Sequence, residues 1–395
     1  MKTKLKLILS IIAILGTVTL FAGSNSQLMY KTIQVNNNPY TVFNGVSGGP
    51  TLNNIKTKEI ALTPLTKMQQ AYLKEQASKI LANTANAAEN QSQNNESYTA
   101  PQTLGSITYA SGLQQAINNM PVLDQGQTGT CATFSTTEAL DILCGNSTDY
   151  YNILDNLYIG AYLSSLNTSY LSQEVQNQMN ILGLTNFPNP WNGSCENLVL
   201  AQYKSYGCIV GEAPNDNNGN FANNDETQMI DPLTSTQVVI PSFTYQTLYV
   251  APSYTQNQTE SYAQQIEGAL HQGKLVVIGI PVDDSQTAPP NGMSGEIYPD
   301  ANNQGQYDIL TTVSNEFAPD VWTCTNQIAS DIENNIKGVG GHAILVTGYI
   351  TNPQYGNFFI IRNSWGADNG TSGNDFISFD YVNNFSTSAT AVWNA

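Results

Sequence analysis

The chain has 395 residues, 41% of them hydrophobic, and a formal net charge of -17 at pH 7. That apolar content is enough for one large or two ordinary domains and excludes a disordered chain. Only 13 lysines and arginines face 30 acidic residues, so nucleic acid and anionic membrane surfaces, which need basic clusters, are excluded as expected partners.

The first 24 residues have the layout of a secretory signal peptide. Lys2, Lys4 and Lys6 precede an apolar run of about 16 residues, and small residues follow at 22–24. A membrane span needs about 20 apolar residues, so residues 1–23 are predicted to be a cleaved signal peptide. No later stretch is apolar enough to cross a bilayer. We expect an exported protein, periplasmic or extracellular, without stable membrane insertion.

Residues 24–105 read as a separate front segment. Two β-rich runs within 29–43 surround an Asn-Asn-Asn-Pro turn and predict a hairpin. Apolar residues near helical spacing in 65–88 predict an amphipathic helix. The stretch 89–106 is polar and rich in structure breakers, so it is predicted to be an exposed linker.

Beyond this linker, helical signals come first and strand signals later. Helices are expected over about 131–144 and 196–205, with helix-leaning sequence to about 182, and again over 260–272. Runs rich in β-formers follow at 274–282, 342–350, 357–363 and 375–382. This order predicts an α+β fold rather than a series of βαβ units.

Cys131 lies where the glycine-containing loop DQGQTGT meets the first of these helices. The amides and dipole at a helix start favour an anion and lower the pKa of a thiol placed there. Position alone does not exclude a small buried cysteine.

The chain has only two histidines. His271 falls in the last turn of a predicted helix and is interpreted as a solvated residue. His342 follows Gly340-Gly341 and starts a predicted strand, and Gly341 allows a substrate to approach closely. Asn363 ends the next β-rich run, 21 residues later. A thiolate, an imidazole and an orienting amide form a nucleophile, base and orienter set, which Trp365 would cover.

Three blocks in the order Cys, His, Asn resemble the papain-like cysteine peptidases: PVLDQGQTGTCATFS (121–135), GGHAILVTGY (340–349) and FIIRNSWGADNG (359–370). Weaker similarity at 192–213 and 264–282 extends the resemblance over most of residues 107–385. The resemblance implies that Cys131 is the nucleophile, His342 the general base and acid, and Asn363 the orienter. It implies that Gln125 supplies an oxyanion-hole donor beside the Cys131 amide.

The resemblance also implies a two-lobed fold, with a helical lobe carrying the cysteine and a β-barrel-like lobe carrying His and Asn. On this basis residues 106–395 form the peptidase domain, with lobes at about 120–235 and 236–395. Residues 24–105 would be an inhibitory propeptide, although a hairpin followed by one helix is atypical. Trp365 and Gly341 would border the substrate. Protein or peptide substrates, a monomeric state and no metal or cofactor are expected.

Several residues depart from the family pattern. Thr128 stands where many members have a disulfide cysteine, Ala132 replaces an aromatic residue, and Asn369 replaces a second tryptophan. The stretch 283–337 is longer than usual. These departures leave open the substrate preference and two alternative functions, a non-catalytic binding protein on the same scaffold and a Cys-His acyl transferase or amidase.

The remaining cysteines are Cys144, Cys195, Cys208 and Cys324. A helix over 196–205 would hold Cys195 and Cys208 up to about 20 Å apart, beyond the reach of a disulfide. Cys144 is therefore expected to join one of that pair and Cys324 the other.

Charge is also uneven along the chain. Residues 24–100 carry six Lys against four Glu, a balance of +2, and residues 101–395 carry four bases against 26 acids, a balance of -22. This predicts an electrostatic attraction that weakens at acid pH.

Overall fold

The computed structural model describes residues 27–35, 38–47, 63–90, 102–126, 128–145, 151, 153–210, 237–239, 241–283, 296–299, 306–310, 321–322, 324, 326–334, 336–351, 357–366 and 373–395. The predicted signal peptide and Asn369 lie outside these ranges. Within them, no helix combines the length and apolar character that a membrane crossing requires.

The helical half is built from α4 (Cys131–Leu143), α5 (Ile153–Ser165), α6 (Gln173–Leu182) and α7 (Glu196–Tyr206), with the short α3 (Gln114–Asn119) and the 3-10 turns η2 (Thr168–Tyr170) and η3 (Pro190–Asn192). Local signals set the boundaries of α6, since the Ser172 hydroxyl accepts from the Val175 amide at the start and Gly183 ends the helix at φ 67°. Leu198 of α7 packs against the apolar face of α6. The predicted helices of this half are confirmed.

The second half is one sheet whose main path runs β11-β14-β13-β12-β8-β15-β6-β7. Its central strands are β8 (Leu275–Asp283), β12 (Val339–Ile350) and β13 (Phe358–Arg362), flanked by β14 (Asn374–Ser378), β11 (Val321–Trp322), β15 (Ser388–Asn394), β6 (Phe243–Val250) and β7 (Tyr254–Thr255). A branch holds β3 (Gln102–Tyr109), β10 (Gln306–Leu310) and β9 (Glu296–Pro299). The other elements described after residue 102 are the helices α8 (Tyr262–His271), α9 (Asn326–Asn334) and α10 (Phe379–Phe385), the 3-10 turn η6 (Ile336–Gly338) and the antiparallel pair β4 (Cys208–Val210) and β5 (Gln237–Val239).

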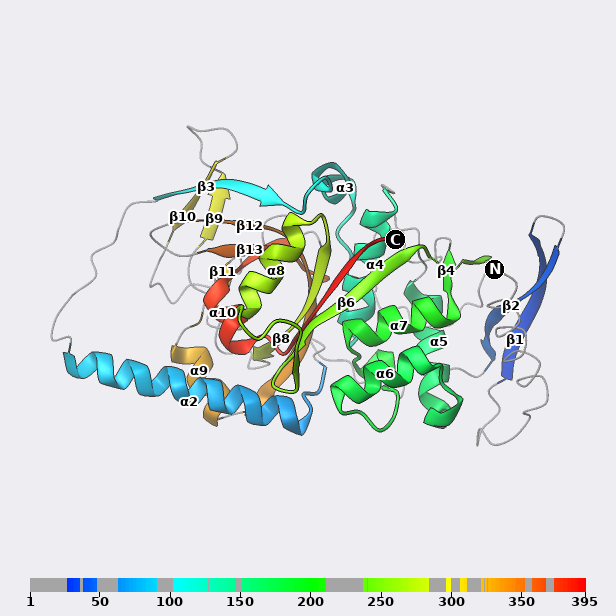
Figure 1. Cartoon of the computed structure of the whole chain (residues 1–395), viewed down its shortest axis with the longest axis horizontal. Helices are drawn as coiled ribbons and strands as arrows, with labels where there is room; N and C mark the ends of the chain where they lie inside the picture. Colours follow the sequence, from blue (N-terminus) through cyan, green and yellow to red (C-terminus); the bar gives the residue numbers. More distant parts are fainter. Residues whose placement is uncertain are drawn as a thin grey trace.

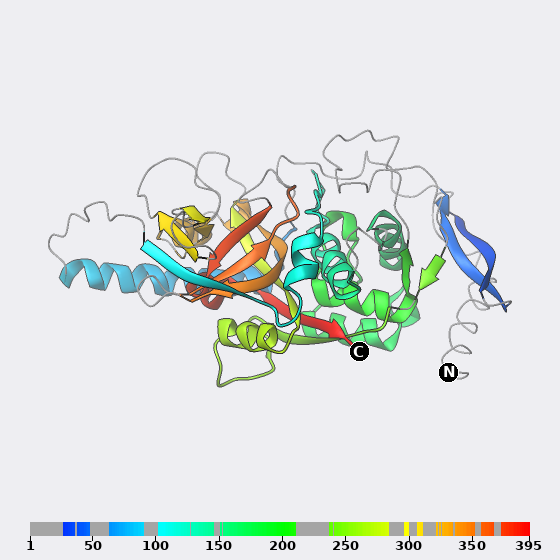
Figure 2. The same ribbon diagram turned by 90° about the horizontal axis from the view of Figure 1, so that it is seen from above.

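The front segment forms the predicted hairpin and helix. β1 (Gln27–Val35) pairs antiparallel with β2 (Asn38–Ser47), and α2 spans Lys67–Asn90. Figure 1 shows α2 lying along the sheet half beside α9, while the hairpin lies at the opposite end next to the helical half. Figure 2 keeps the same separation when the molecule is seen from above. The two parts of the front segment therefore contact different halves of the fold.

Two sequence predictions are wrong in part. Residues 102–106, expected in the linker, belong to β3, which pairs with β10 and β12 from much later in the chain. The run 375–382 was expected to be a strand, but the strand ends at Ser378, whose hydroxyl accepts from the Tyr381 amide and starts α10. Long-range pairing explains the first difference, and a local helix cap explains the second. The α+β fold class is confirmed, with Cys131 in the helical half and His342 and Asn363 in the sheet half.

Candidate active site

Cys131 is the first residue of α4 and is almost fully buried. Its Sγ accepts from the Ala343 amide at 3.3 Å. Because Ala343 follows His342 in β12, this contact joins the start of α4 to the strand that carries the histidine. The thiol also lies 3.7 Å from the Thr63 hydroxyl. The sequence prediction that Cys131 begins a helix and meets the His342 segment is confirmed.

His342 lies in β12 opposite Ile280 of β8, with its ring buried. Its Nε2 is 2.9 Å from Asn363 Oδ1, and Asn363 directly follows β13. The Trp365 ring stacks on the imidazole, with centroids 4.6 Å apart and an interplanar angle of 21°. The predicted contact of Asn363 with the histidine and the cover by Trp365 are therefore both present.

Both reactive groups are held neutral by burial in this state. Burial lowers the pKa of His342 to about 4, and the hydrogen bond with Asn363 opposes this shift. Burial also raises the pKa of the Cys131 thiol, opposed by the Ala343 amide, the Thr63 hydroxyl and the first amides of α4. A thiolate on Cys131 and an imidazolium on His342 would need water or further hydrogen bonds to stabilise their charges. The site is thus arranged as a neutral thiol and a neutral imidazole.

Gln125 is fully buried in the loop before α4. Its Nε2 donates to Thr128 O at 2.7 Å, and its Oε1 accepts from the Ser364 hydroxyl at 2.5 Å. Since an amide nitrogen carries two N–H bonds, this contact uses one of the two donors on Gln125 Nε2. Thr128 donates its hydroxyl to Gln125 O at 2.8 Å, so a hydrogen bond braces the loop at this position.

Backbone pairing joins this loop to the segment that carries Asn363 and Trp365. The Gln125 backbone amide donates to Ser364 O at 2.8 Å. Asp124 and Trp365 form an isolated antiparallel β-bridge. The Gly366 amide donates to Leu123 O at 3.0 Å. The loop therefore cannot shift without moving the residues that contact His342.

Thr63 of the front segment crosses directly over the thiol. Its amide donates to Gly341 O at 2.8 Å, and the Gly341 amide donates to Thr63 O at 2.6 Å, which forms an antiparallel bridge to β12. On the other side, a Cβ at Gly193 would overlap the Thr63 side chain, and Gly193 has φ 121°. The backbone edge of Gly341, expected to border a substrate, is thus occupied by the protein's own front segment.

Apolar contacts hold α2 in place after Thr63. Leu73 and Ala77 are fully buried, and Leu65 and Tyr72 are nearly so. They join the main core cluster, which includes residues of α8, α9 and α10. Among the ion pairs of the described part, Lys79 of α2 pairs with Glu75 of the same helix at 2.8 Å. The described contacts therefore favour apolar burial over the expected charge attraction as the docking force.

A buried ion pair links the two halves beneath the site. Arg362 Nη1 lies 3.3 Å from Glu138 Oε1 and donates to Met120 O at 2.8 Å. Glu138 lies two turns along α4 from Cys131. Burial raises the pKa of Glu138 to about 7, opposed by the nearby guanidinium. The pair fixes α4 against β13, which leads into Asn363.

Sequence reasoning missed two contacts of this site. Asn363 Nδ2 donates to Asp375 Oδ2 at 2.9 Å, and Asp375 is fully buried in β14. The sequence placed Asp375 in an ordinary β-run, and only the pairing of β13 with β14 brings it behind Asn363. Thr63 lacked any local signal, because a lone threonine before a helix has many ordinary roles. His271, interpreted as solvated, is exposed at the end of α8, which confirms that interpretation, and its Nε2 lies 2.9 Å from the Tyr349 hydroxyl.

All five cysteines are free thiols, so the expected disulfides are not confirmed. The helix α7 does separate Cys195 from Cys208, as predicted. The Cys144 thiol lies instead 3.2 Å from the Tyr151 hydroxyl. In the part of the chain that the structure describes, no three His, Cys, Asp or Glu side chains gather as a metal site would require.

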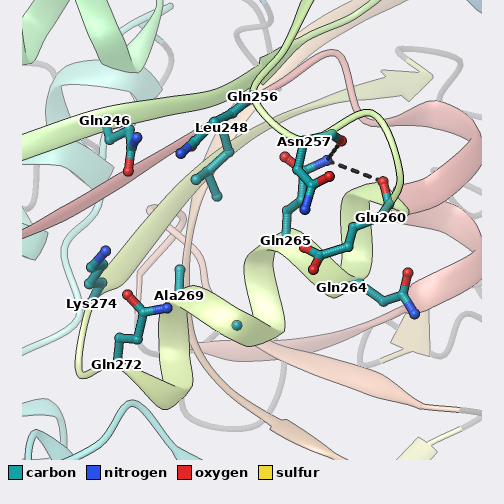
Figure 3. A pocket seen from close by; sticks show the side chains of 11 residues that line it. Gln246, Leu248, Gln256, Asn257, Glu260, Gln264, Gln265, Ala269, Gln272 and Lys274 are labelled. Carbon is teal, nitrogen blue, oxygen red and sulfur yellow. Dashed lines mark hydrogen bonds between the residues drawn. The ribbon is translucent and has the colours of Figure 1, made fainter.

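A polar recess of about 420 Å³ lies between β6 and α8, apart from the residues above. Figure 3 shows the amide side chains around it, with Gln265 Nε2 donating to the backbone oxygens of Asn257 and Glu260. Gln265 thereby secures the turn that enters α8. None of the candidate catalytic residues lines this recess, so it forms no part of the candidate active site.

No protein-family profile matches the chain, and neither does any curated protein. This chain is similar to solved structures of cysteine proteases and their proforms. The digestive procathepsin L 3 of the Tenebrio molitor larval midgut shares 18% identity at a TM-score of 0.37, over 83% of this chain and 91% of that one. Xylellain, a cysteine protease from Xylella fastidiosa, shares 14% identity at a TM-score of 0.38, over 86% and 98%.

Proposed function

We propose that the chain is an exported cysteine peptidase, made as an inactive precursor, that hydrolyses peptide bonds through a thioester on Cys131. The observation that carries this proposal is the meeting of Cys131 with the His342 and Asn363 segment, closed over by Thr63. A buried nucleophile and base covered by the chain's own segment fit a zymogen. Export follows from the signal-peptide pattern of residues 1–23.

The chemistry follows from these positions once the front segment leaves. Solvation removes the penalty that keeps the site neutral, so the Cys131 proton passes to His342 and forms a thiolate and an imidazolium. The thiolate attacks the peptide carbonyl carbon, and the developing oxyanion accepts from Gln125 Nε2 and the Cys131 amide. His342 gives its proton to the leaving amine, and a thioester remains.

Hydrolysis completes the cycle. His342 takes a proton from water, the resulting hydroxide attacks the thioester, and the Cys131 thiolate leaves. Asn363 holds the imidazole by its Nε2 throughout, so that Nδ1 is the nitrogen that exchanges protons. In the described part of the chain, Nδ1 is buried and makes no hydrogen bond in the closed state.

The test uses the purified precursor and a form cut between α2 and β3 and separated from the front segment. The processed form should hydrolyse casein and react with an epoxide thiol trap at Cys131, whereas the precursor should do neither at a comparable rate. Cys131→Ala should abolish both, and Cys324→Ala, at a thiol far along the chain, should retain them. Peptide binding by a processed form that neither cleaves nor labels would support the binding-protein alternative. Acyl transfer to an added amine in place of hydrolysis would support the transferase alternative.

A further inference from the structure

We infer that Asp375 is a positioning residue of this site, acting through Asn363 to fix the orientation of His342. The inference rests on the proposed peptidase function. It assigns a role to a residue that the Cys, His, Asn pattern does not include.

The side-chain amide of Asn363 is held at both ends. Its Oδ1 accepts from the Ser364 amide at 2.9 Å, and its Nδ2 donates to Asp375 Oδ2 at 2.9 Å. A backbone N–H can only donate, and a carboxylate can only accept. The two partners therefore specify which end is oxygen and which is nitrogen, so a flipped amide would face two mismatched partners.

The orientation of the Asn363 amide in turn determines which nitrogen of His342 carries the proton. Since Asn363 Oδ1 carries no hydrogen, the contact at 2.9 Å requires the proton on His342 Nε2. Nδ1 then keeps its lone pair and can accept the thiol proton. Asp375 thus selects the tautomer that catalysis needs, although it does not touch the imidazole.

The Asp375 carboxylate and the Asn363 amide lie in the interior, close to the imidazole. Asp375 and Asn363 are both fully buried, and the Asn363 amide also donates from its backbone to Gly373 O at 3.0 Å, just before β14. The carboxylate therefore lies one amide away from the imidazole, where it would stabilise the imidazolium form through Asn363.

The test compares processed enzymes carrying Asp375→Ala, Asp375→Asn, Asn363→Ala and the Asn363→Ala/Asp375→Ala pair. Casein hydrolysis gives kcat and KM, and iodoacetamide alkylation of Cys131 from pH 4 to 10 gives the ionisation of the pair. Asp380→Asn, an exposed change on α10, is the matched control. Asp375→Asn keeps the size and an acceptor oxygen, so it remains informative if the alanine variant does not fold.

Asp375→Ala should lower kcat by about tenfold with KM within about twofold, as expected for a misoriented catalytic group. The alkaline limb of the alkylation profile should move to lower pH, and Asp375→Asn should show the same shift with a smaller loss of kcat. In the Asn363→Ala background, Asp375→Ala should change kcat by less than about twofold. Equal losses in both backgrounds, or an unshifted profile, would overturn the inference. A processed wild-type protein without activity would overturn the proposed function and the inference together. An active wild type whose Asp375 variants behave like it would overturn the inference alone.

Discussion

Truncation of Leu73 tests how α2 is held over the site. Leu73 of α2 is fully buried in the core cluster that the front segment shares with the sheet half. A buried Leu→Ala change lowers the free energy of unfolding by about 2–5 kcal/mol. A loss of about 3 kcal/mol from docking corresponds to an increase of roughly 100-fold in the undocked population. Because alkylation of Cys131 requires undocking, its rate in the uncleaved precursor should rise by about the same factor.

The assay is iodoacetamide labelling followed by mass spectrometry of chains that remain intact. Lys74→Ala, at the exposed neighbour on the same helix, and Leu182→Ala, at a buried leucine of α6, are the matched controls. Both should label within about threefold of wild type, because neither changes the α2 contact. A Leu73→Ala rate no higher than that of Lys74→Ala would refute docking by apolar burial. An equal acceleration by Leu182→Ala would refute a local effect.

Four further outcomes are expected. Gly193→Ala, at φ 121° and against Thr63, should speed labelling of Cys131 in the precursor at least about tenfold; Gly341→Ala, with only ordinary contacts, should not. Burial raises the pKa of Cys131 and lowers that of His342 to about 4, so precursor labelling should stay slow through neutral pH, whereas the processed form should show a fast plateau there. Arg362→Met leaves the buried Glu138 carboxylate unpaired, so the free energy of unfolding measured in urea at pH 8 should fall by about 3–5 kcal/mol. Because burial raises the pKa of Glu138 to about 7, this carboxyl becomes protonated as pH falls toward 5, and the loss of unfolding free energy should become smaller. Thiol titration of the denatured, unreduced chain should find five groups, and a count of three or one would restore the disulfide prediction.

The sequence was sufficient for the parts of the site that depend on local order. Cys131 follows a glycine-containing loop at a helix start, and Asn363 and Trp365 lie in one short segment, so the local order of residues was enough to predict where they stand in the fold. The roles assigned to them came from the resemblance of the sequence blocks. The helix α10 had a readable signal as well, since Ser378 caps it. That signal was masked by the β-forming residues around it.

The remaining features depend on contacts between distant segments. β3 becomes a strand through pairing with β10 and β12, and its own polar residues indicated a linker. Asp375 reaches Asn363 only because β13 and β14 pair in a register that sets Ile361 opposite Asp375. A one-residue slip would turn its side chain to the other face of the sheet. Such register cannot be read from one sequence.

The bridge between Thr63 and Gly341 also determines how activation depends on protein concentration. While Thr63 and β12 belong to one chain, the front segment is present beside the site at an effective concentration in the millimolar range. A cut between α2 and β3 leaves β3 paired in the sheet and makes the front segment a separate ligand. Cleavage would then leave the site closed in a concentrated sample and open it on dilution, so a peptidase of the kind proposed above would become active where it is released into a large volume.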